Sequence, residues 1–548
     1  MDTCNVADIL ARYSKPRIKE PQDFSCPKTL KVVSVTFHAP LDLTIHDSQG
    51  MYDPGAEHDA CGVGMVTTLN KRPERKIVDD AIEVLVNLNH RGAVGAEENT
   101  GDGAGILMSM PDEFMRATAG VELPEEGHYA AGIAFLDRDI ATSGQQEQAI
   151  SKIVREEGLE VLAWRVVPTN PDGLGLQALA SMPAFKTLIV ADPEGKLGGI
   201  ELDRKTFRIR KRVEHEVGIY FASLSARTIT YKGMLTTMQL KPFFLDLSDE
   251  RMKAKIAIVH SRFSTNTTPS WKRAHPNRII LHNGEINTIR GNINRMLARE
   301  ETMASPVLGE EIARVYPVVE TDGSDSSMLD NTLEFLMYSG IELPKAVMLC
   351  IPEPWGRDKN MSREKRDMFH YYASMMEPWD GPAAILFSDG EQVGAVLDRN
   401  GLRPARYLVT NDGYLILASE VGALPIPPER IVRKSRLQPG KMLLVDTRTG
   451  TVLEDRELKH RYAAEHPYGE WLDQELLQLA DIPIPNRKVP EYTALERSRL
   501  YKIFGYTYDE IHSAILPMAK NGTEPTASMG ADIPLAVLSE KHQPLFYY

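Results

Sequence analysis

The stretch Asp59-Ala60-Cys61-Gly62-Val63-Gly64-Met65-Val66 places one cysteine at the start of an apolar strand. The two glycines after it leave space beside the sulfur for a small ligand. A turn signal, Met51-Tyr52-Asp53-Pro54-Gly55, lies just upstream. A cysteine in a strand is more often a packing residue than a nucleophile. Cys61 becomes a candidate nucleophile because polar motifs suited to amide cleavage follow it along the chain.

Three such motifs lie downstream. They are His90-Arg91-Gly92-Ala93, His260-Ser261-Arg262-Phe263-Ser264-Thr265-Asn266 and His282-Asn283-Gly284-Glu285-Ile286-Asn287-Thr288. Attack on an amide carbonyl places negative charge on its oxygen, so hydrogen-bond donors must be aimed at that position. Asn283 and Gly284 offer a side-chain amide beside a backbone N–H. An Asn-Gly pair after an apolar strand is also the commonest hairpin signal, and taken alone it favours a turn.

Charged and hydroxyl side chains in the same motifs are suited to holding an amino acid by its α-groups. Arg262, at the end of a predicted strand, can fork onto a carboxylate, and Thr265 adds a hydroxyl. Asp325, in the acidic segment 322–326, can hold an ammonium group. That segment lacks the alternation and terminal Glu of an EF-hand, so no metal is expected there. Arg91 has the alternative interpretation of an ordinary helix C-terminal charge.

The one base that the sequence suggests for removing the Cys61 thiol proton is the α-amine of the cysteine itself. Thiolate is the reactive species, and an ordinary thiol with a pKa of about 8.5 forms little of it at neutral pH. Cleavage of the Ala60–Cys61 bond gives an α-amine that titrates at about 7.7–8.0. N-terminal threonine nucleophiles use the same arrangement. No His-Asp pair is evident near Cys61, so the mature chain is predicted to begin there.

Composition excludes several classes of protein. The 548 residues are 25% charged and 42% hydrophobic, as in a globular protein with a large core. A net charge of -13 argues against general affinity for nucleic acid or an anionic membrane. No apolar run of about 18 residues and no secretory signal is present. The four cysteines are scattered without a C-x-x-C pair, which indicates neither zinc nor an iron–sulfur cluster and suits a reducing cytoplasm.

Periodicity divides the chain into three parts. Residues 1–60 are predicted to be an N-terminal extension, which is a propeptide if the chain is cleaved before Cys61. Residues 61–455 are predicted to be the catalytic domain, and 456–548 a charged, helical part with a Pro-rich linker. Strands at both ends of the central part, with helices between them, indicate sheets packed together and covered by helices. Strands are predicted at 61–69, 160–168, 254–260, 278–282, 384–387, 392–397 and 413–418, and a helix at 77–89.

Long segments of the chain resemble the N-terminal class II glutamine amidotransferase part of the large subunit of glutamate synthase. These segments are 100–107, 262–267, 376–383 and 397–404. The resemblance implies an α+β fold, the four-layer αββα sandwich of the N-terminal-nucleophile hydrolases, over residues 61–455. It also implies the glutaminase half-reaction, in which glutamine is hydrolysed to glutamate and ammonia.

Site residues follow from the resemblance by matched position. It implies that the nucleophile is Cys61 and that Asn283 and Gly284 form the oxyanion hole. It also implies that Arg262 and Asp325 bind the α-groups of glutamine. Arg91, beside the catalytic cysteine, and Thr265 are the further substrate-binding residues expected.

The resemblance further implies parts that lie outside this chain. Glutamate synthases continue past position 548, and their flavin-binding barrel and iron–sulfur cysteines lie in that continuation. This chain is therefore expected to carry no FMN, iron–sulfur cluster or metal. Residues 456–548 are expected to form an incomplete C-terminal α/β segment of the central domain. The expected partners are L-glutamine and the remaining glutamate synthase domains or subunits, which transfer the ammonia reductively to 2-oxoglutarate.

Two other interpretations stay open. One is an inactive, truncated remnant, and the other is the amidotransferase module of a different class II enzyme. Intact motifs favour an active glutaminase over a remnant. The segment 397–401, and the lack of an attached nucleotide-binding motif, favour glutamate synthase over asparagine- or phosphoribosylamine-forming enzymes.

Overall fold

The computed structural model describes residues 61–95, 97–262, 267–483, 488 and 490–526. The predicted extension 1–60 and the candidate residue Thr265 lie outside the described residues. The chain divides into two compact units, one ending at Gly469 and the other beginning at Glu470. All predicted site residues belong to the first unit.

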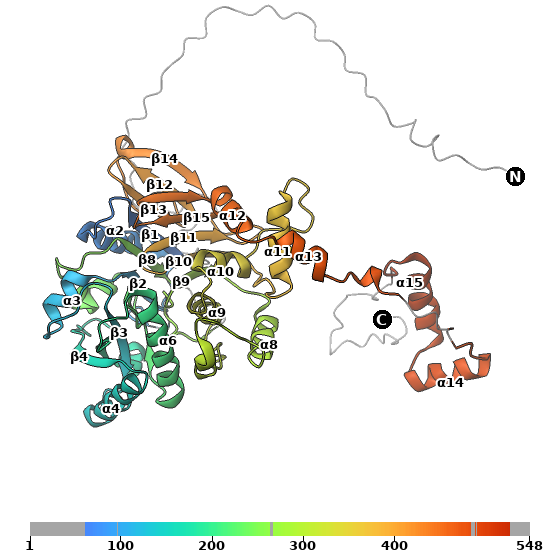
Figure 1. The fold of residues 1–548 in the computed structure, drawn as a ribbon, viewed down its shortest axis with the longest axis horizontal. Helices are drawn as coiled ribbons and strands as arrows, with labels where there is room; N and C mark the ends of the chain where they lie inside the picture. The colour runs from blue at the N-terminus through green and yellow to red at the C-terminus, as the bar shows by residue number, and fades with distance from the viewer. Residues whose placement is uncertain (1–60, 96, 263–266, 484–487, 489, 527–548) are drawn as a thin grey trace, which may run out of the picture. The chain divides into compact units, whose positions relative to one another are not determined.

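Two antiparallel sheets form the centre of the first unit (Figure 1). In spatial order, the described strands of the larger sheet are β14 (Ile431–Arg436), β12 (Arg406–Thr410), β13 (Tyr414–Ala418), β1 (Gly62–Thr68), β8 (Ile256–Ser261), β2 (Ala104–Ser109) and β7 (Thr228–Gly233). Those of the smaller sheet are β16 (Thr451–Glu454), β15 (Met442–Asp446), β11 (Gln392–Leu397), β10 (Ala383–Ser388) and β9 (Ile280–Gly284).

The two sheets pack face to face through alternate residues of their strands. In a strand, residues two apart point to the same face. Buried side chains at such spacing form one apolar layer between the sheets, made by Val63, Met65, Ile256, Ile258, Leu281, Leu386, Val393, Ala395 and Val445 among others. This inter-sheet layer is the frame on which the site residues are placed.

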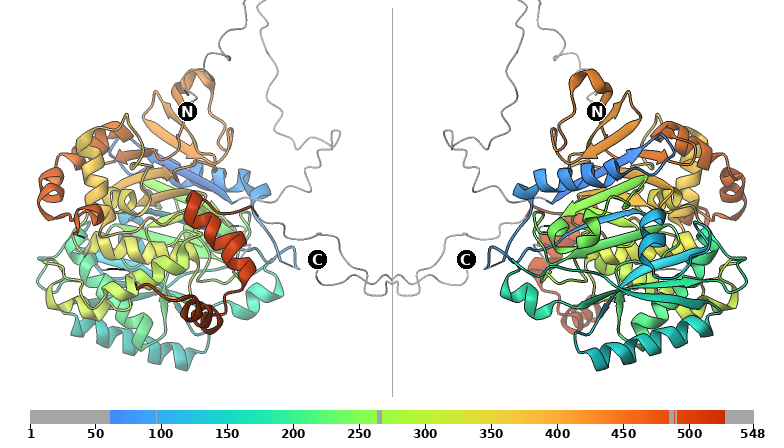
Figure 2. Two further views of the ribbon diagram at one scale, coloured as in Figure 1. Left: turned by 90° about the vertical axis from the view of Figure 1, so that its right-hand side faces the viewer. Right: turned by 90° about the vertical axis from the view of Figure 1, so that its left-hand side faces the viewer.

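Helices cover the outer faces of the two sheets (Figures 1 and 2). Helix α2 (Arg75–Asn87) packs on β1 and β8, and α9 (Asp325–Tyr338) packs on β9. Helix α2 forms because Ile77, Ala81 and Val84 recur at helical spacing, and all three are buried. The predicted αββα sandwich is confirmed, as are the predicted helix and the seven predicted strands, with ends shifted by a few residues.

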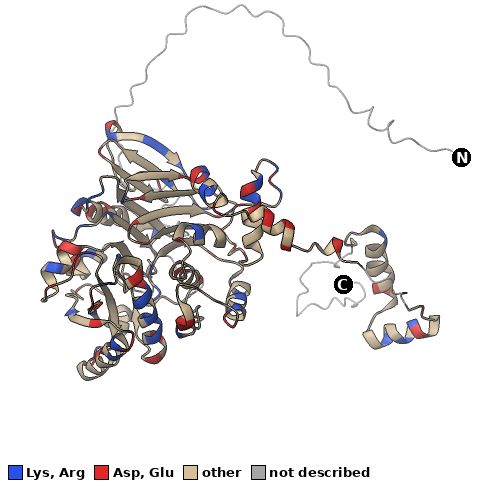
Figure 3. Cartoon of the chain, in the orientation of Figure 1, with Lys and Arg blue, Asp and Glu red and all other residues tan. Residues whose placement is uncertain are grey.

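A third sheet widens this frame. Its described strands are β4 (Glu160–Val166), β5 (Ala184–Ala191), β3 (Tyr129–Leu136) and β6 (Tyr220–Phe221). Helices α4 (Ile140–Glu156) and α6 (Gly199–Glu216) pack on one face of it through a separate apolar cluster. In Figure 3 the outer helices α4 and α6 carry charges of both signs, whereas most strands carry few.

The remaining helices connect these layers or follow them. In the first unit they are α3 (Asp112–Thr118), α5 (Leu176–Ser181), α7 (Leu240–Phe243), α8 (Ile289–Arg299), α10 (Leu343–Cys350), α11 (Arg363–Ala373) and α12 (Asp455–Ala463). Helix α13 (Tyr468–Glu475) begins at the end of the first unit, and α14 (Ala494–Phe504) and α15 (Leu516–Asn521) belong to the second. No helix of the described chain is long and apolar enough to cross a bilayer.

Candidate active site

The candidate nucleophile lies where the layer between the two sheets reaches the surface. Val63 and Met65 of β1 point into that layer, and Cys61 precedes them with the same alternation. Cys61 is partly exposed, whereas Gly62 is buried. A side chain at position 62 would approach the Cβ of Leu88 to 2.8 Å, so only glycine fits against α2. The thiol is thus presented at the open end of a rigid, buried strand.

Asn283 approaches Cys61 from the opposite sheet. Leu281 of β9 lies in the inter-sheet layer, and Asn283, two residues later, points the same way. Its Nδ2 donates a hydrogen bond of 2.9 Å to the backbone oxygen of Cys61. An amide nitrogen carries two hydrogens, so a second donor is present at the same place.

The hairpin-turn interpretation of Asn283-Gly284 is wrong. Both residues are the last of β9 and pair with Ala384 and Ala383 of β10. Gly284 has φ +148°, and a Cβ there would lie 1.8 Å from the oxygen of Pro382. Glycine is therefore required by a close backbone approach inside a sheet. An Asn-Gly pair signals a hairpin only where the strand turns back after two residues, and here it continues beside its neighbour.

Cys61 opens into a pocket of about 380 Å³. The pocket is large enough for an amino acid, since it exceeds the lower end of the usual volume of small-molecule sites. It brings together five groups from distant parts of the chain, and they are Cys61, Arg262, Gly284, Asp325 and His282.

Arg262 and Asp325 supply opposite charges to this pocket. Arg262 is buried, and burial lowers the pKa of its guanidinium from the ordinary value, although Cys61 and Asp102 act in the other direction. Its Nη1 donates to the oxygen of Arg273 at 2.6 Å, which fixes the fork. Asp325 is the first residue of α9, where the helix dipole favours a negative charge. Its carboxylate accepts from the backbone N–H of Ile286 at 2.9 Å.

Arg91 lies near the nucleophile but takes part in a different contact. Its Cβ is 3.2 Å from the position a Cβ would take on Gly62, the residue after Cys61. Its guanidinium donates to Glu420, which also contacts His90. Arg91 does not line the 380 Å³ pocket that holds Cys61.

Three buried histidines that the sequence did not single out as site residues line the Cys61 pocket. His260, His275 and His282 are at most 4% exposed, and all three line the Cys61 pocket. Burial lowers the pKa of each imidazole, to about 3 for His260. They are therefore neutral at physiological pH. His260 and His282 stood at the ends of apolar strands, which was the signal available from the sequence.

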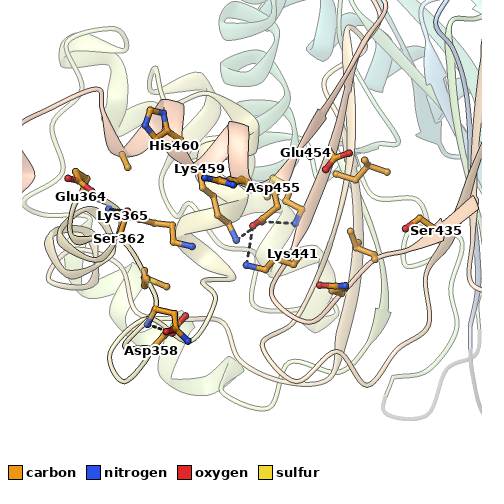
Figure 4. Close-up of a pocket in the computed structure, with 18 of the residues that line it drawn as sticks. Asp358, Ser362, Glu364, Lys365, Ser435, Lys441, Glu454, Asp455, Lys459 and His460 are labelled. Carbon is orange, nitrogen blue, oxygen red and sulfur yellow. Dashed lines mark hydrogen bonds and ion pairs between the residues drawn. The ribbon is translucent and has the colours of Figure 1, made fainter. Parts of the chain in front are cut away.

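A second pocket, of about 730 Å³, has different chemistry (Figure 4). Lys459 donates to Asp455 at 2.6 Å, and Lys441 lies 3.2 Å from the same carboxylate. Glu353 also pairs with both lysines. These ion pairs tie α12 to the sheet. The pocket contains no cysteine and none of the predicted site residues, so the Cys61 pocket is the candidate active site. Across the described chain, no group of three His, Cys, Asp or Glu residues is arranged to hold a metal.

Comparison with known proteins places this chain in a family. The sequence pattern of the family described as "Glutamine amidotransferases class-II" matches residues 61–471, beginning at Cys61. The chain therefore belongs to the class-II glutamine amidotransferases, as the sequence predicted. A second pattern, "Glutamate synthase central domain", matches residues 499–548.

Similar curated proteins are glutamate synthases. The glutamate synthase [NADPH] large chain of Bacillus subtilis is 45% identical over 507 residues, which are 91% of this chain and 33% of that protein. The glutamate synthase [NADH] of Schizosaccharomyces pombe is 43% identical over 522 residues, 91% of this chain and 25% of that protein. A chloroplastic ferredoxin-dependent glutamate synthase of Oryza sativa is 40% identical over 506 residues, which are 90% of this chain and 31% of that protein. The chain thus spans a third or less of the length of these relatives.

Proposed function

We propose that the first unit is a glutaminase that releases ammonia from L-glutamine for use by glutamate synthase domains. The observation that carries this proposal is the contact between Asn283 Nδ2 and the backbone of Cys61, at the mouth of a pocket that also contains Arg262 and Asp325. A thiol, an aimed amide donor and two opposite charges are the groups that amide hydrolysis of an amino acid needs.

The reaction begins with attack of the Cys61 sulfur on the side-chain carbonyl carbon of glutamine. Asn283 and the backbone N–H of Gly284 stabilise the negative charge that forms on the carbonyl oxygen. Collapse of this tetrahedral intermediate breaks the C–N bond, and the proton taken from the thiol leaves with ammonia. Water then attacks the γ-glutamyl thioester, which releases glutamate and restores the thiol.

Substrate orientation follows from the charges in the pocket. The guanidinium of Arg262 pairs with the α-carboxylate of glutamine in the fork geometry that arginine favours. The carboxylate of Asp325 holds the α-ammonium, and Thr265 adds a hydroxyl. Arg91, whose Cβ lies against Gly62 next to the nucleophile, is a further substrate-binding residue. These contacts select an amino acid and leave its side-chain amide at the sulfur.

Maturation by cleavage before Cys61 completes the site. The freed α-amine, with an ordinary pKa of about 7.7–8.0, takes the thiol proton. Residues 1–60 are then a propeptide, and residues 61–455 the glutaminase domain. Residues 456–548 are a linker and the start of the central domain, a division that the match over 499–548 supports.

The ammonia is used elsewhere in the complete enzyme. Because the chain spans a third or less of its relatives, we assign reductive transfer to 2-oxoglutarate, with FMN and an iron–sulfur cluster, to other domains or subunits. The four scattered cysteines of this chain support that division. A thiol nucleophile also suits a reducing compartment such as the cytoplasm.

An ammonia-release assay on the purified protein tests the proposal. Glutamine is expected to yield equal amounts of glutamate and ammonia, and asparagine neither, because its shorter side chain does not bring the amide to the sulfur once the α-groups are held. An absence of glutamine hydrolysis after cleavage before Cys61 would overturn the proposal.

A further inference from the structure

A buried histidine connects the two sheets beside the candidate oxyanion hole. Ile256 and Ile258 of β8 point into the inter-sheet layer, and His260 continues the same row. Its Nε2 lies 2.9 Å from the backbone oxygen of His282 in β9. A carbonyl oxygen only accepts, so Nε2 carries the proton and His260 is the donor. The acceptor residue immediately precedes Asn283.

Two hydrogen bonds therefore cross between the sheets at this point, in opposite directions. Asn283 of β9 donates to Cys61, next to β1, and His260 of β8 donates back to β9. The Asn283 bond fixes the distance between the amide donor and the residue that carries the nucleophile. The His260 bond holds β9 against β8, in which His260 pairs with Val63 of β1, two residues after Cys61. An oxyanion donor acts only at a defined position, so this spacing matters for turnover.

A second contact extends from His260 to the helix that carries Asp325. The ring of His275 stacks on that of His260, with centroids 4.3 Å apart and an interplanar angle of 20°. His275 Nε2 lies 2.9 Å from the hydroxyl of Ser326, the residue after Asp325. The Ser326 hydroxyl in turn lies 3.0 Å from that of Ser324, which caps α9.

The imidazoles of His260 and His275 each bury a polar nitrogen in a way that lowers the stability of the fold. The Nδ1 atoms of His260 and His275 are buried and have no hydrogen-bond partner among the described residues. A buried polar nitrogen without a partner destabilises the fold, whereas an apolar side chain of similar size would not. Apolar packing alone therefore does not explain why histidines occupy these two positions. The hydrogen bonds made by their Nε2 atoms do explain it.

We propose that His260 and His275 are positioning residues that couple the strand end bearing Asn283 to the helix start bearing Asp325. This inference rests on the proposed glutaminase function, because it assigns the two ends to the oxyanion and to the substrate ammonium. His260 sets the position of Asn283, and His275 sets that of Asp325 through Ser326. Neither ring exchanges a proton with substrate.

The proposal predicts a separation of kinetic effects along the chain of contacts. His260→Leu removes the donor to β9 and is expected to lower kcat for glutamine about tenfold with little change in KM, as loss of a group used in the transition state does. His260→Gln returns an amide N–H near the Nε2 position and is expected to recover most of the loss.

The other end of the chain is expected to show the opposite pattern. His275→Phe keeps the ring stacking but loses the bond to Ser326, and Ser326→Ala removes the same bond from the other side. Both are expected to raise KM several-fold with kcat nearly unchanged. Combined, they are expected to do no more than either alone, since residues that share one bond are not additive.

The matched control is Val445→Ala, in the same inter-sheet layer but on β15. It removes buried apolar surface away from the site and is expected to lower thermal stability without separating kcat from KM. If His260→Leu, His275→Phe and Val445→Ala all lower activity in the same proportion as stability, the two histidines are merely structural and the proposal is overturned.

Hydrogen exchange separates this inference from the proposed function. The amides at the end of β9 are expected to exchange faster in His260→Leu than in wild type or Val445→Ala, and those at the start of α9 faster in His275→Phe. Such local changes in a protein without glutaminase activity would uphold the coupling and refute the function. Unchanged local exchange in both histidine variants would refute the coupling, whatever the activity.

Discussion

The side-chain amide of Asn283 donates a 2.9 Å hydrogen bond to the backbone oxygen of Cys61, across 222 positions of sequence. Asn283 lies near the end of β9, and Cys61 immediately precedes β1 of the other sheet, so the bond joins the two sheets at the mouth of the Cys61 pocket. The bond holds an amide donor against the backbone of the residue that carries the thiol, and it forms without substrate. Such prearrangement is what makes an oxyanion hole effective, because the donors need not reorganise during the reaction.

Cys61→Ala is expected to abolish glutamine hydrolysis with little effect on folding, because the sulfur forms the covalent intermediate. Cys61→Ser is expected to be almost as inactive, since a hydroxyl near the same amine is a much weaker nucleophile. Ammonia release and thermal denaturation measure the two properties. Cys350→Ala is the control: that thiol is fully buried, burial raises its pKa, and it is expected to be dispensable. Near-normal turnover in Cys61→Ala would move the chemistry elsewhere.

Asn283→Ala is expected to lower kcat by about 10²–10³ while KM changes little, because the oxyanion exists only during the reaction. Steady-state kinetics on glutamine measures both constants. Gly284→Ala provides the contrast, since a Cβ would lie 1.8 Å from the oxygen of Pro382. That variant is expected to lose the β9–β10 pairing and fold poorly. A raised KM with normal kcat in Asn283→Ala would contradict its assignment to the oxyanion hole.

Arg262→Lys and Asp325→Asn are expected mainly to raise KM, because they hold charges present equally in the ground and transition states. A hydrogen bond to a charged group contributes about 1.5–3 kcal/mol, so a rise of roughly ten- to a hundredfold is expected. Lysine also loses the bidentate geometry. Asparagine keeps an oxygen to accept from Ile286, so Asp325→Asn tests charge rather than the loop contact. A loss confined to kcat in both variants would show that these residues do not bind substrate.

Acid stability is expected to depend on Glu353. Burial alone would raise the pKa of this carboxyl, but Lys459, Lys365 and Lys441 lower it to about 2. A carboxyl with a lowered pKa stabilises the fold above its ordinary pKa of about 4.5, and the contribution is lost as pH falls from there to about 2. The contribution of Glu353 to the free energy of unfolding is about 3 kcal/mol, because each unit of pKa shift corresponds to about 1.36 kcal/mol.

Glu353→Gln is therefore expected to be less stable than wild type at pH 7, with the difference shrinking as pH falls below about 4.5. Denaturant unfolding at a series of pH values measures it. Glu364→Gln is the matched control, because Glu364 lines the 730 Å³ pocket together with Lys365, Lys441 and Lys459 (Figure 4) but is exposed. A stability difference that stayed constant down to pH 2 would contradict the lysine network as its cause.

Strand and helix positions near the site followed from sequence because they depend on local alternation. The apolar runs that contain Val63, Ile258 and Leu281 predicted β1, β8 and β9, and helical spacing predicted α2. Asp389-Gly390 joins β10 to β11, and Gly390 has φ +92°, so the turn between these two predicted strands follows from a local Asp-Gly pair. Local turn chemistry determined these elements.

Contacts between residues far apart in the chain could not be predicted from the sequence. Asn283-Gly284 looked like a turn because the sequence does not show that the backbone oxygen of Pro382, just before β10, would lie 1.8 Å from a Cβ at Gly284. The stacking of His260 on His275, and the bond from His275 to Ser326, join three separate segments. Likewise Arg91 was expected beside the cysteine, and the sequence does not show its ion pair with Glu420, which lies 329 residues away along the chain. Such pairings depend on how the sheets stack.

The central claim is that Cys61 is the N-terminal nucleophile of a glutaminase site. Intact-protein and peptide mass spectrometry, after reaction with a glutamine analogue that carries an electrophilic side-chain ketone, tests it most directly. The account predicts one adduct per chain, on a peptide whose first residue is Cys61, formed in step with loss of ammonia release and blocked by excess glutamine. An adduct on another residue, or an active chain in which Ala60 still precedes Cys61, would contradict it.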